Sequence, residues 1–196
     1  MHKCIYLHGL NSSGDSEKAG ILTERLAPIP VLAPDYPAHQ PDNAIERLSD
    51  FLRGLVAGPD AASGLVLIGS SMGGFYGRYL ARHFDIEHLF MINPALKPWS
   101  LLREFIGQSM TTALGETYEV TRKMVEQTRH YAVEGPADGA PTTIFIDAGD
   151  EVVPPAIARG LYANHGRVMT FPGGDHCFQH LDAAIDVIRS QLGVDG

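Results

Sequence analysis

The sequence predicts a three-layer α/β fold, in which helices cover both faces of a mostly parallel sheet of about six strands. Short apolar runs alternate with amphipathic stretches along most of the chain, as expected for strands joined by crossover helices. The run at residues 65–69 is apolar throughout, which a strand needs when both faces of its sheet are buried.

The predicted elements of the first half follow in order. Residues 4–7 form an apolar strand that ends at a His-Gly pair. Residues 16–27 have apolar side chains at helical spacing. A second strand, 31–33, is stopped by proline. The next helix, 41–56, begins with proline and has one apolar face, and a Gly-Pro-Asp sequence at 58–60 ends it.

The second half repeats this pattern after the strand at 65–69. A helix over 72–83 follows that strand directly, and an Asn-Pro pair stops a fourth strand at 89–92. The remaining predicted elements are strands at 143–147 and 167–171 and helices at 155–164 and 180–192.

One region, residues 95–140, breaks the alternation and contains no good strand. We expect short helices near 100–108 and 120–132, followed by a stretch rich in glycine, proline and alanine at 134–141. Long insertions in compact domains are usually functional. The region is therefore predicted to be a lid-like insertion.

Length and composition agree with one globular domain over residues 1–196. An apolar fraction of 44% and a charged fraction of 19% exclude a disordered chain. A net charge of −8 disfavours a nucleic-acid partner, whose phosphates would meet a negative field. No apolar run approaches the roughly 18–20 residues of a membrane span.

The cysteines and the start of the chain predict a cytoplasmic protein. Cys4 and Cys177 are too few for a disulfide scaffold and are expected to be reduced thiols. Residues 1–3 lead straight into an apolar strand that is too short for the core of a signal peptide. These features leave the oligomeric state open.

A Gly-x-Ser-x-Gly pattern centred on Ser71 follows the third strand. The bare pattern is common, but its place between a strand and a helix forces the central residue into a strained turn that exposes its hydroxyl. Ser70 is the competing nucleophile, although Ile68 and Met72 occupy the positions where it would need glycine. We therefore predict Ser71 as a catalytic nucleophile.

A serine nucleophile needs a general base, which a carboxylate orients. Among the later histidines, His176 follows the last strand in a Gly-Gly-Asp-His loop, whereas His180 is expected on the final helix. The acid should follow the fifth strand, where Asp150 is preferred and Asp147 is held in reserve. Glu151 is expected to point away from its neighbour and to suit the next helix N-terminus.

The oxyanion of an acyl-transfer reaction needs hydrogen-bond donors. The predicted donors are the backbone N–H groups of Met72 and Leu10, with Asn11 as the next candidate. His8 is expected to shape this loop without chemistry. No metal or organic cofactor is expected, because the histidine pair at 176 and 180 lacks a nearby third ligand in the sequence.

With these residues assembled, the sequence resembles the α/β-hydrolases, and more narrowly the small YqiA-type bacterial esterases. The blocks that carry the resemblance are Tyr6-Leu7-His8-Gly9-Leu10-Asn11-Ser12-Ser13, Gly69-Ser70-Ser71-Met72-Gly73-Gly74-Phe75-Tyr76, Asn93-Pro94-Ala95, Gly149-Asp150-Glu151-Val152 and Gly173-Gly174-Asp175-His176.

The resemblance implies a serine esterase with Ser71, Asp150 and His176 as its triad. It implies a small-molecule acyl ester as substrate, and an acyl thioester is a further option. The first predicted strand carries the oxyanion loop, so we expect a fold without the two leading strands of larger members. We expect the remaining strands in the spatial order 2-1-3-4-5-6.

Apolar and aromatic residues of the insertion are candidates for an acyl pocket. We predict Asn11, Trp99 and Phe105 as substrate-binding residues, although for each aromatic residue taken singly, packing of the insertion onto the sheet is the more common role. Two other functions stay open. One is a binding protein of the same fold without catalysis, and the other is a cofactor-free peroxidase or lyase with the same triad.

Overall fold

A computed structural model describes residues 2–57, 64–135 and 139–194. Its main sheet has six strands in the order β2-β1-β3-β4-β7-β8, and every neighbouring pair is parallel. This is the spatial order that the sequence predicts. The strands are β1 (His2–Leu7), β2 (Val31–Leu32), β3 (Gly64–Ser70), β4 (Ile86–Ile92), β7 (Thr142–Asp147) and β8 (Arg167–Phe171).

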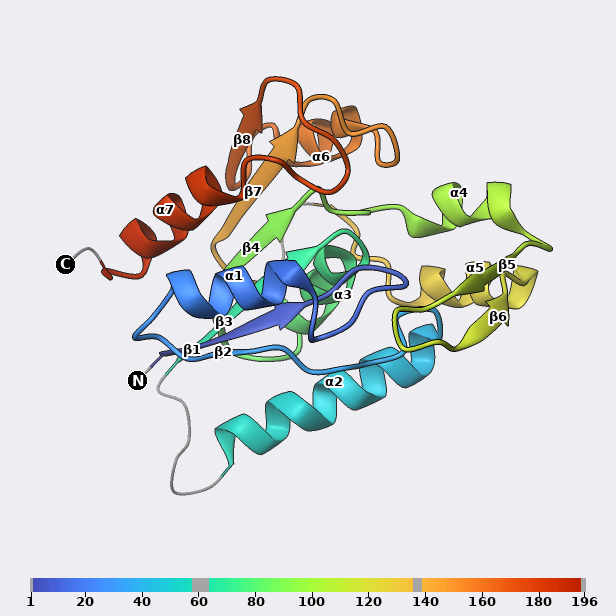
Figure 1. The fold of residues 1–196 in the computed structure, drawn as a ribbon, viewed down its shortest axis with the longest axis horizontal. Helices are drawn as coiled ribbons and strands as arrows, with labels where there is room; N and C mark the ends of the chain where they lie inside the picture. Colours follow the sequence, from blue (N-terminus) through green and yellow to red (C-terminus); the bar gives the residue numbers. More distant parts are fainter. Residues whose placement is uncertain (1, 58–63, 136–138, 195–196) are drawn as a thin grey trace.

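Helices cover both faces of this sheet (Figure 1). One face packs against α1 (Glu17–Arg25) and α7 (Leu181–Gln191). The other packs against α2 (Pro41–Val56), α3 (Met72–Ala81) and α6 (Pro155–Tyr162). The predicted helix stop at 58–60 lies outside the described residues, as do 136–138 of the predicted linker.

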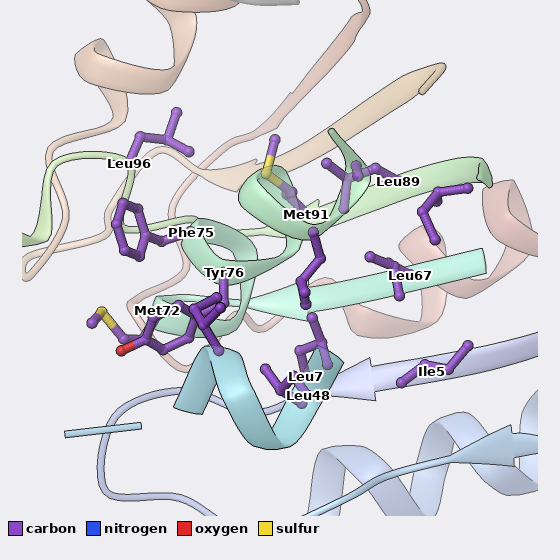
Figure 2. Packing of buried hydrophobic residues seen from close by; sticks show 14 of the residues in the cluster. Ile5, Leu7, Leu48, Leu67, Met72, Phe75, Tyr76, Leu89, Met91 and Leu96 are labelled. Carbon is purple, nitrogen blue, oxygen red and sulfur yellow. The ribbon is translucent and has the colours of Figure 1, made fainter. Parts of the chain in front are cut away.

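The alternation of side chains along each strand produces two separate cores, one on each face of the sheet. Ile5 and Leu7 of β1 join the core beneath α2 and α3, whereas Cys4 and Tyr6 join the core beneath α1 and α7. Figure 2 shows the first of these cores, in which Leu48 of α2 packs beside the strand residues. Strands buried on both faces are rich in apolar residues, as in β3, although β4 and β7 also bury His88, Thr142, Thr143 and Asp147.

The segment between β4 and β7 contains a hairpin, so the prediction of no strand there is wrong. β5 (Ser109–Thr111) pairs antiparallel with β6 (Thr117–Glu119). Strands of three residues, largely polar and exposed, carry no apolar run that a sequence pattern can detect. The same segment holds α4 (Pro98–Leu102), a short 3-10 helix (Arg103–Phe105) and α5 (Arg122–His130).

The hairpin, α4 and α5 lie beyond the carboxyl ends of the strands (Figure 1). Loops at this edge of a parallel sheet are where ligands bind in open α/β folds. Within the described ranges, no helix is both long enough and apolar enough to cross a membrane.

Candidate active site

Ser71 lies at the sharp turn between β3 and α3. Its backbone has φ of 52° and ψ of −115°, a strained conformation for a residue with a side chain. The Ser71 N–H donates to the carbonyl of Ile92 at 3.0 Å, which anchors the turn to β4. A side chain at Gly73 would collide with the carbonyl of Leu7. Glycine there lets α3 cross closely over β1 and holds the serine hydroxyl above the sheet edge.

A continuous line of hydrogen bonds joins Ser71, His176 and Asp150. Nε2 of His176 lies 3.0 Å from Oγ of Ser71, and its Nδ1 lies 2.9 and 3.0 Å from the two carboxylate oxygens of Asp150. The Asp150 side chain is only 1% exposed. Backbone N–H groups of Val152 and Val153 donate to the same carboxylate, which fixes its orientation. This arrangement can take a proton from the serine hydroxyl.

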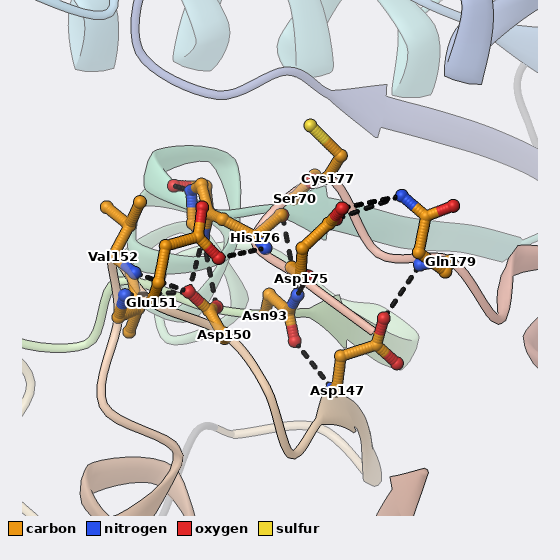
Figure 3. A network of polar contacts seen from close by, with 12 residues as sticks. Ser70, Asn93, Asp147, Asp150, Glu151, Val152, Asp175, His176, Cys177 and Gln179 are labelled. Atoms are coloured by element: carbon orange, nitrogen blue, oxygen red, sulfur yellow. Dashed lines mark hydrogen bonds and ion pairs between the residues drawn. The ribbon is translucent and has the colours of Figure 1, made fainter. Parts of the chain in front are cut away.

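Asn93 holds the loop that carries His176 against the end of the sheet (Figure 3). Its side-chain amide donates to the carbonyl of Asp175 at 2.9 Å and to that of His176 at 3.4 Å. Its side-chain oxygen accepts from the N–H of Asp147 at 2.9 Å. Asparagine tolerates the positive φ of 41° found here. One buried side chain therefore links β4, β7 and the His176 loop.

Asp147, the reserve candidate for the acid, belongs to a second carboxylate–histidine pair. Its side chain is fully buried, and it accepts from Nδ1 of His180 at 2.6 Å and from the N–H of Gln179 at 2.7 Å. The carboxylate of Glu151 accepts from the N–H of His176 at 3.1 Å. Three carboxylates therefore surround the loop, and only that of Asp150 contacts the His176 ring.

The loop after β1 passes close over Ser71. A side chain at Gly9 would lie 3.3 Å from Cβ of Ser71. Leu10 and Met72, whose N–H groups are the predicted oxyanion donors, both line the pocket beside Ser71. The ring of His8 stacks on Tyr36 at 4.2 Å, and burial lowers the pKa of His8. This packing contact agrees with a role in shaping the loop.

A pocket of about 380 Å³ opens beside Ser71 and His176, a size suited to a small molecule. Asn11 and Phe105, two of the predicted substrate-binding residues, line it. Trp99, the third, lies elsewhere. Its ring packs against Phe75 at 6.3 Å, and the Arg129 guanidinium lies over it. The structure therefore gives Trp99 the packing role that the sequence left open.

Asn11 also joins the loop after β1 to the β5–β6 hairpin. Its carbonyl accepts from the N–H of Ala113 at 2.9 Å, and its side-chain oxygen accepts from the Tyr118 hydroxyl at 2.8 Å. Its side-chain amide lies 3.6 Å from the sulfur of Met110, which lines the pocket. The hairpin is thus fastened directly to the loop over Ser71.

Sequence reasoning missed one charged residue of the pocket, Lys18 of α1. Nothing in its local sequence distinguishes it from an exposed lysine on an amphipathic helix. The described part of the chain holds no group of three or more side chains placed to bind a metal ion.

Residues 3–192 match the family described as "Uncharacterised protein family (UPF0227)". The chain belongs to this family. Membership confirms the resemblance to YqiA-type proteins, and similar solved structures share the α/β-hydrolase fold.

Three of those structures illustrate the likeness. Est1E from Butyrivibrio proteoclasticus superimposes with a TM-score of 0.74 at 19% identity, covering 96% of this chain and 86% of its own. A monoacylglycerol lipase from Paleococcus ferrophilus gives 0.74 at 19%, covering 96% and 93%. An esterase domain from Rhodothermus marinus gives 0.71 at 18%, covering 95% and 82%. At these identities the likeness establishes the fold.

Proposed function

We propose that the chain is a serine esterase that hydrolyses carboxylic esters through a covalent acyl-enzyme on Ser71. The observation that carries the proposal is the unbroken line of hydrogen bonds from the buried Asp150 through His176 to Ser71, beside a pocket of small-molecule size. The similarity to an esterase, an esterase domain and a monoacylglycerol lipase supports the same class of substrate.

The reaction has two steps. In the first, Oγ of Ser71 attacks the ester carbonyl while Nε2 of His176 takes the hydroxyl proton, and the Asp150 carboxylate stabilises the imidazolium. The backbone N–H groups of Leu10 and Met72 bind the oxyanion. His176 then gives its proton to the leaving alcohol. Water repeats the sequence on the acyl-enzyme and releases the acid, and no step requires a metal or organic cofactor.

The segment between β4 and β7 supplies the lid of this site in our proposal. Residues from α4, from the 3-10 helix and from β5 line the pocket with apolar side chains, namely Leu101, Leu102, Phe105 and Met110. Apolar lining suits an acyl chain. An acyl thioester would react by the same steps, because its carbonyl and its leaving group meet the same catalytic atoms.

A fluorophosphonate probe and a para-nitrophenyl ester test the proposal together. Wild-type protein should be labelled on Ser71 and should hydrolyse the ester, whereas Ser71→Ala should lose both properties while keeping its fold. Ser190→Ala, on an exposed position of α7, is the matched control. Turnover retained by Ser71→Ala would exclude Ser71 as the nucleophile. A folded wild-type protein without labelling or turnover would favour a non-catalytic binding protein.

A further inference from the structure

The mechanism leaves Lys18 of the pocket unused. Its ammonium donates to Oγ of Ser70 at 3.2 Å and to the carbonyl of Cys177 at 3.0 Å. These acceptors belong to the residues next to Ser71 and His176 in the sequence. The positive charge therefore lies beside the reacting groups, on the wall of the same pocket.

The two hydrogen-bond acceptors of this ammonium are both neutral oxygens. Among the described residues, no carboxylate lies within ion-pair distance of Lys18. Burial lowers the pKa of Lys18, and the charges of Cys177, Asp147 and Asp175 oppose this effect. Both of those aspartates already bind other side chains. The pocket thus holds a half-buried cation without a close counter-ion.

Hydroxyl groups share the pocket with this cation, and that of Ser70 accepts from its ammonium. Tyr6, Ser16 and Ser70 line the pocket together with Lys18, and they come from β1, the start of α1 and the end of β3. Burial raises the pKa of Tyr6 to about 12, against the opposing effect of its hydrogen bonds with Ser16 and Ser70, so its hydroxyl stays protonated. Much of the apolar lining comes from the segment between β4 and β7, and the rest comes from Leu10, Met72, Val152 and Val153. We call Lys18, Tyr6, Ser16 and Ser70 the polar wall, and the apolar residues between β4 and β7 the apolar wall.

We propose that the polar wall binds a carboxylate of the substrate, so that the preferred substrates are esters with a negative charge near the scissile carbonyl. This inference rests on the proposed esterase function and defines its substrate class. One ammonium among neutral hydroxyls matches a single negative charge, whereas a phosphate dianion is usually met by several cations or amides. The net charge of −8 repels anions in general, so a local cation is required to hold one.

Matched ester pairs test the charge preference on each side of the scissile bond. Para-butyryloxybenzoate and its methyl ester differ in a charge on the alcohol side. The mono-para-nitrophenyl ester of adipic acid and para-nitrophenyl hexanoate differ in a charge on the acyl side. The measured quantity is the ratio of kcat/KM for the charged ester to kcat/KM for the neutral one. This ratio cancels any general loss of activity in a variant.

For wild-type protein we expect a ratio above one for at least one pair. Lys18→Met should lower that ratio by about ten-fold or more, because a charge-assisted hydrogen bond is lost. Lys18→Arg should keep most of it, and Lys123→Met, which removes an exposed charge from α5, should leave it unchanged. If Lys18 had a purely structural role, Lys18→Met would lower kcat/KM for both esters of a pair by the same factor, and the ratio would not change.

The outcomes separate this inference from the proposed function. A wild-type ratio at or below one for both pairs overturns the inference, even if Lys18→Met does not fold. An equal ratio in wild type and Lys18→Met overturns it as well. If neutral esters are hydrolysed in a Ser71-dependent way and charged esters are not preferred, the esterase proposal stays intact. If no ester is hydrolysed in a Ser71-dependent way, the esterase proposal itself is overturned.

Discussion

Two buried aspartates near the end of β7 provide a matched test of which carboxylate acts in catalysis. Asp150 accepts from Nδ1 of His176 at 2.9 Å, and Asp147 accepts from Nδ1 of His180 at 2.6 Å. Replacing either one by asparagine keeps the volume and removes the charge. Only the first pair continues to Ser71, the proposed nucleophile, through the 3.0 Å contact with His176.

Asp150→Asn should lower kcat by about four orders of magnitude. The new amide can donate to Nδ1, which favours the tautomer with its proton on Nε2, and that nitrogen can no longer accept from Ser71. At about 1.4 kcal/mol per factor of ten, the loss corresponds to roughly 5.5 kcal/mol of transition-state stabilisation. The remaining side-chain oxygen still accepts from Val153, so the loop should keep its fold.

Asp147→Asn should act mainly on stability. Asp147 contacts Gln179 and His180 but neither Ser71 nor the His176 ring. Weakening one buried charge-assisted bond should cost about 1–3 kcal/mol of unfolding free energy, and kcat should fall by less than about ten-fold. Turnover of a para-nitrophenyl ester and unfolding in urea measure the two effects. Equal losses of kcat in both variants, at equal stability, would refute the assignment of Asp150.

Three further predictions follow from particular contacts. Gly174→Ala should lower the unfolding free energy by about 2 kcal/mol or more in urea, because its Cβ would collide with the Asp147 carboxylate at a φ of +72°. Asn93→Ala should lower kcat by about ten-fold with little change in KM, since the His176 loop loses its tether, and faster proteolysis of that loop would accompany it. Burial lowers the pKa of His88 from 6.5 to about 4, so the fold favours the neutral ring. The unfolding free energy should fall as the pH drops from 6.5 towards 4, by up to about 3 kcal/mol. In His88→Gln, urea unfolding at a series of pH values should show a smaller fall over the same range.

The predictable part of this protein lies in its sheet. The central strands are rich in apolar residues, and turn residues end them, so their positions follow from local patterns. Ser71, Asp150 and His176 each come after a strand of the sheet, and parallel strands bring their carboxyl ends to one edge. The structure places these three side chains within hydrogen-bond reach of one another.

The parts that sequence patterns missed depend on contacts between distant residues. The β5–β6 hairpin has strands too short and too polar for a detectable period. The Asn93-Pro94 pair is recognisable as a strand stop, but the bond from Asn93 to the His176 loop spans more than eighty residues. Lys18 has the local sequence of a surface helix, and only the approach of Ser70 and Cys177 gives it a different environment.

The attachment of the hairpin to Asn11 has a consequence for how proteins with this site can diversify. The residue that fastens the hairpin is the immediate neighbour of Leu10, whose amide is proposed to bind the oxyanion, so a shift of the hairpin also moves that donor. Exchanging the hairpin between relatives would therefore alter turnover together with selectivity. Changes on the apolar wall and changes at the oxyanion loop would have to evolve in concert.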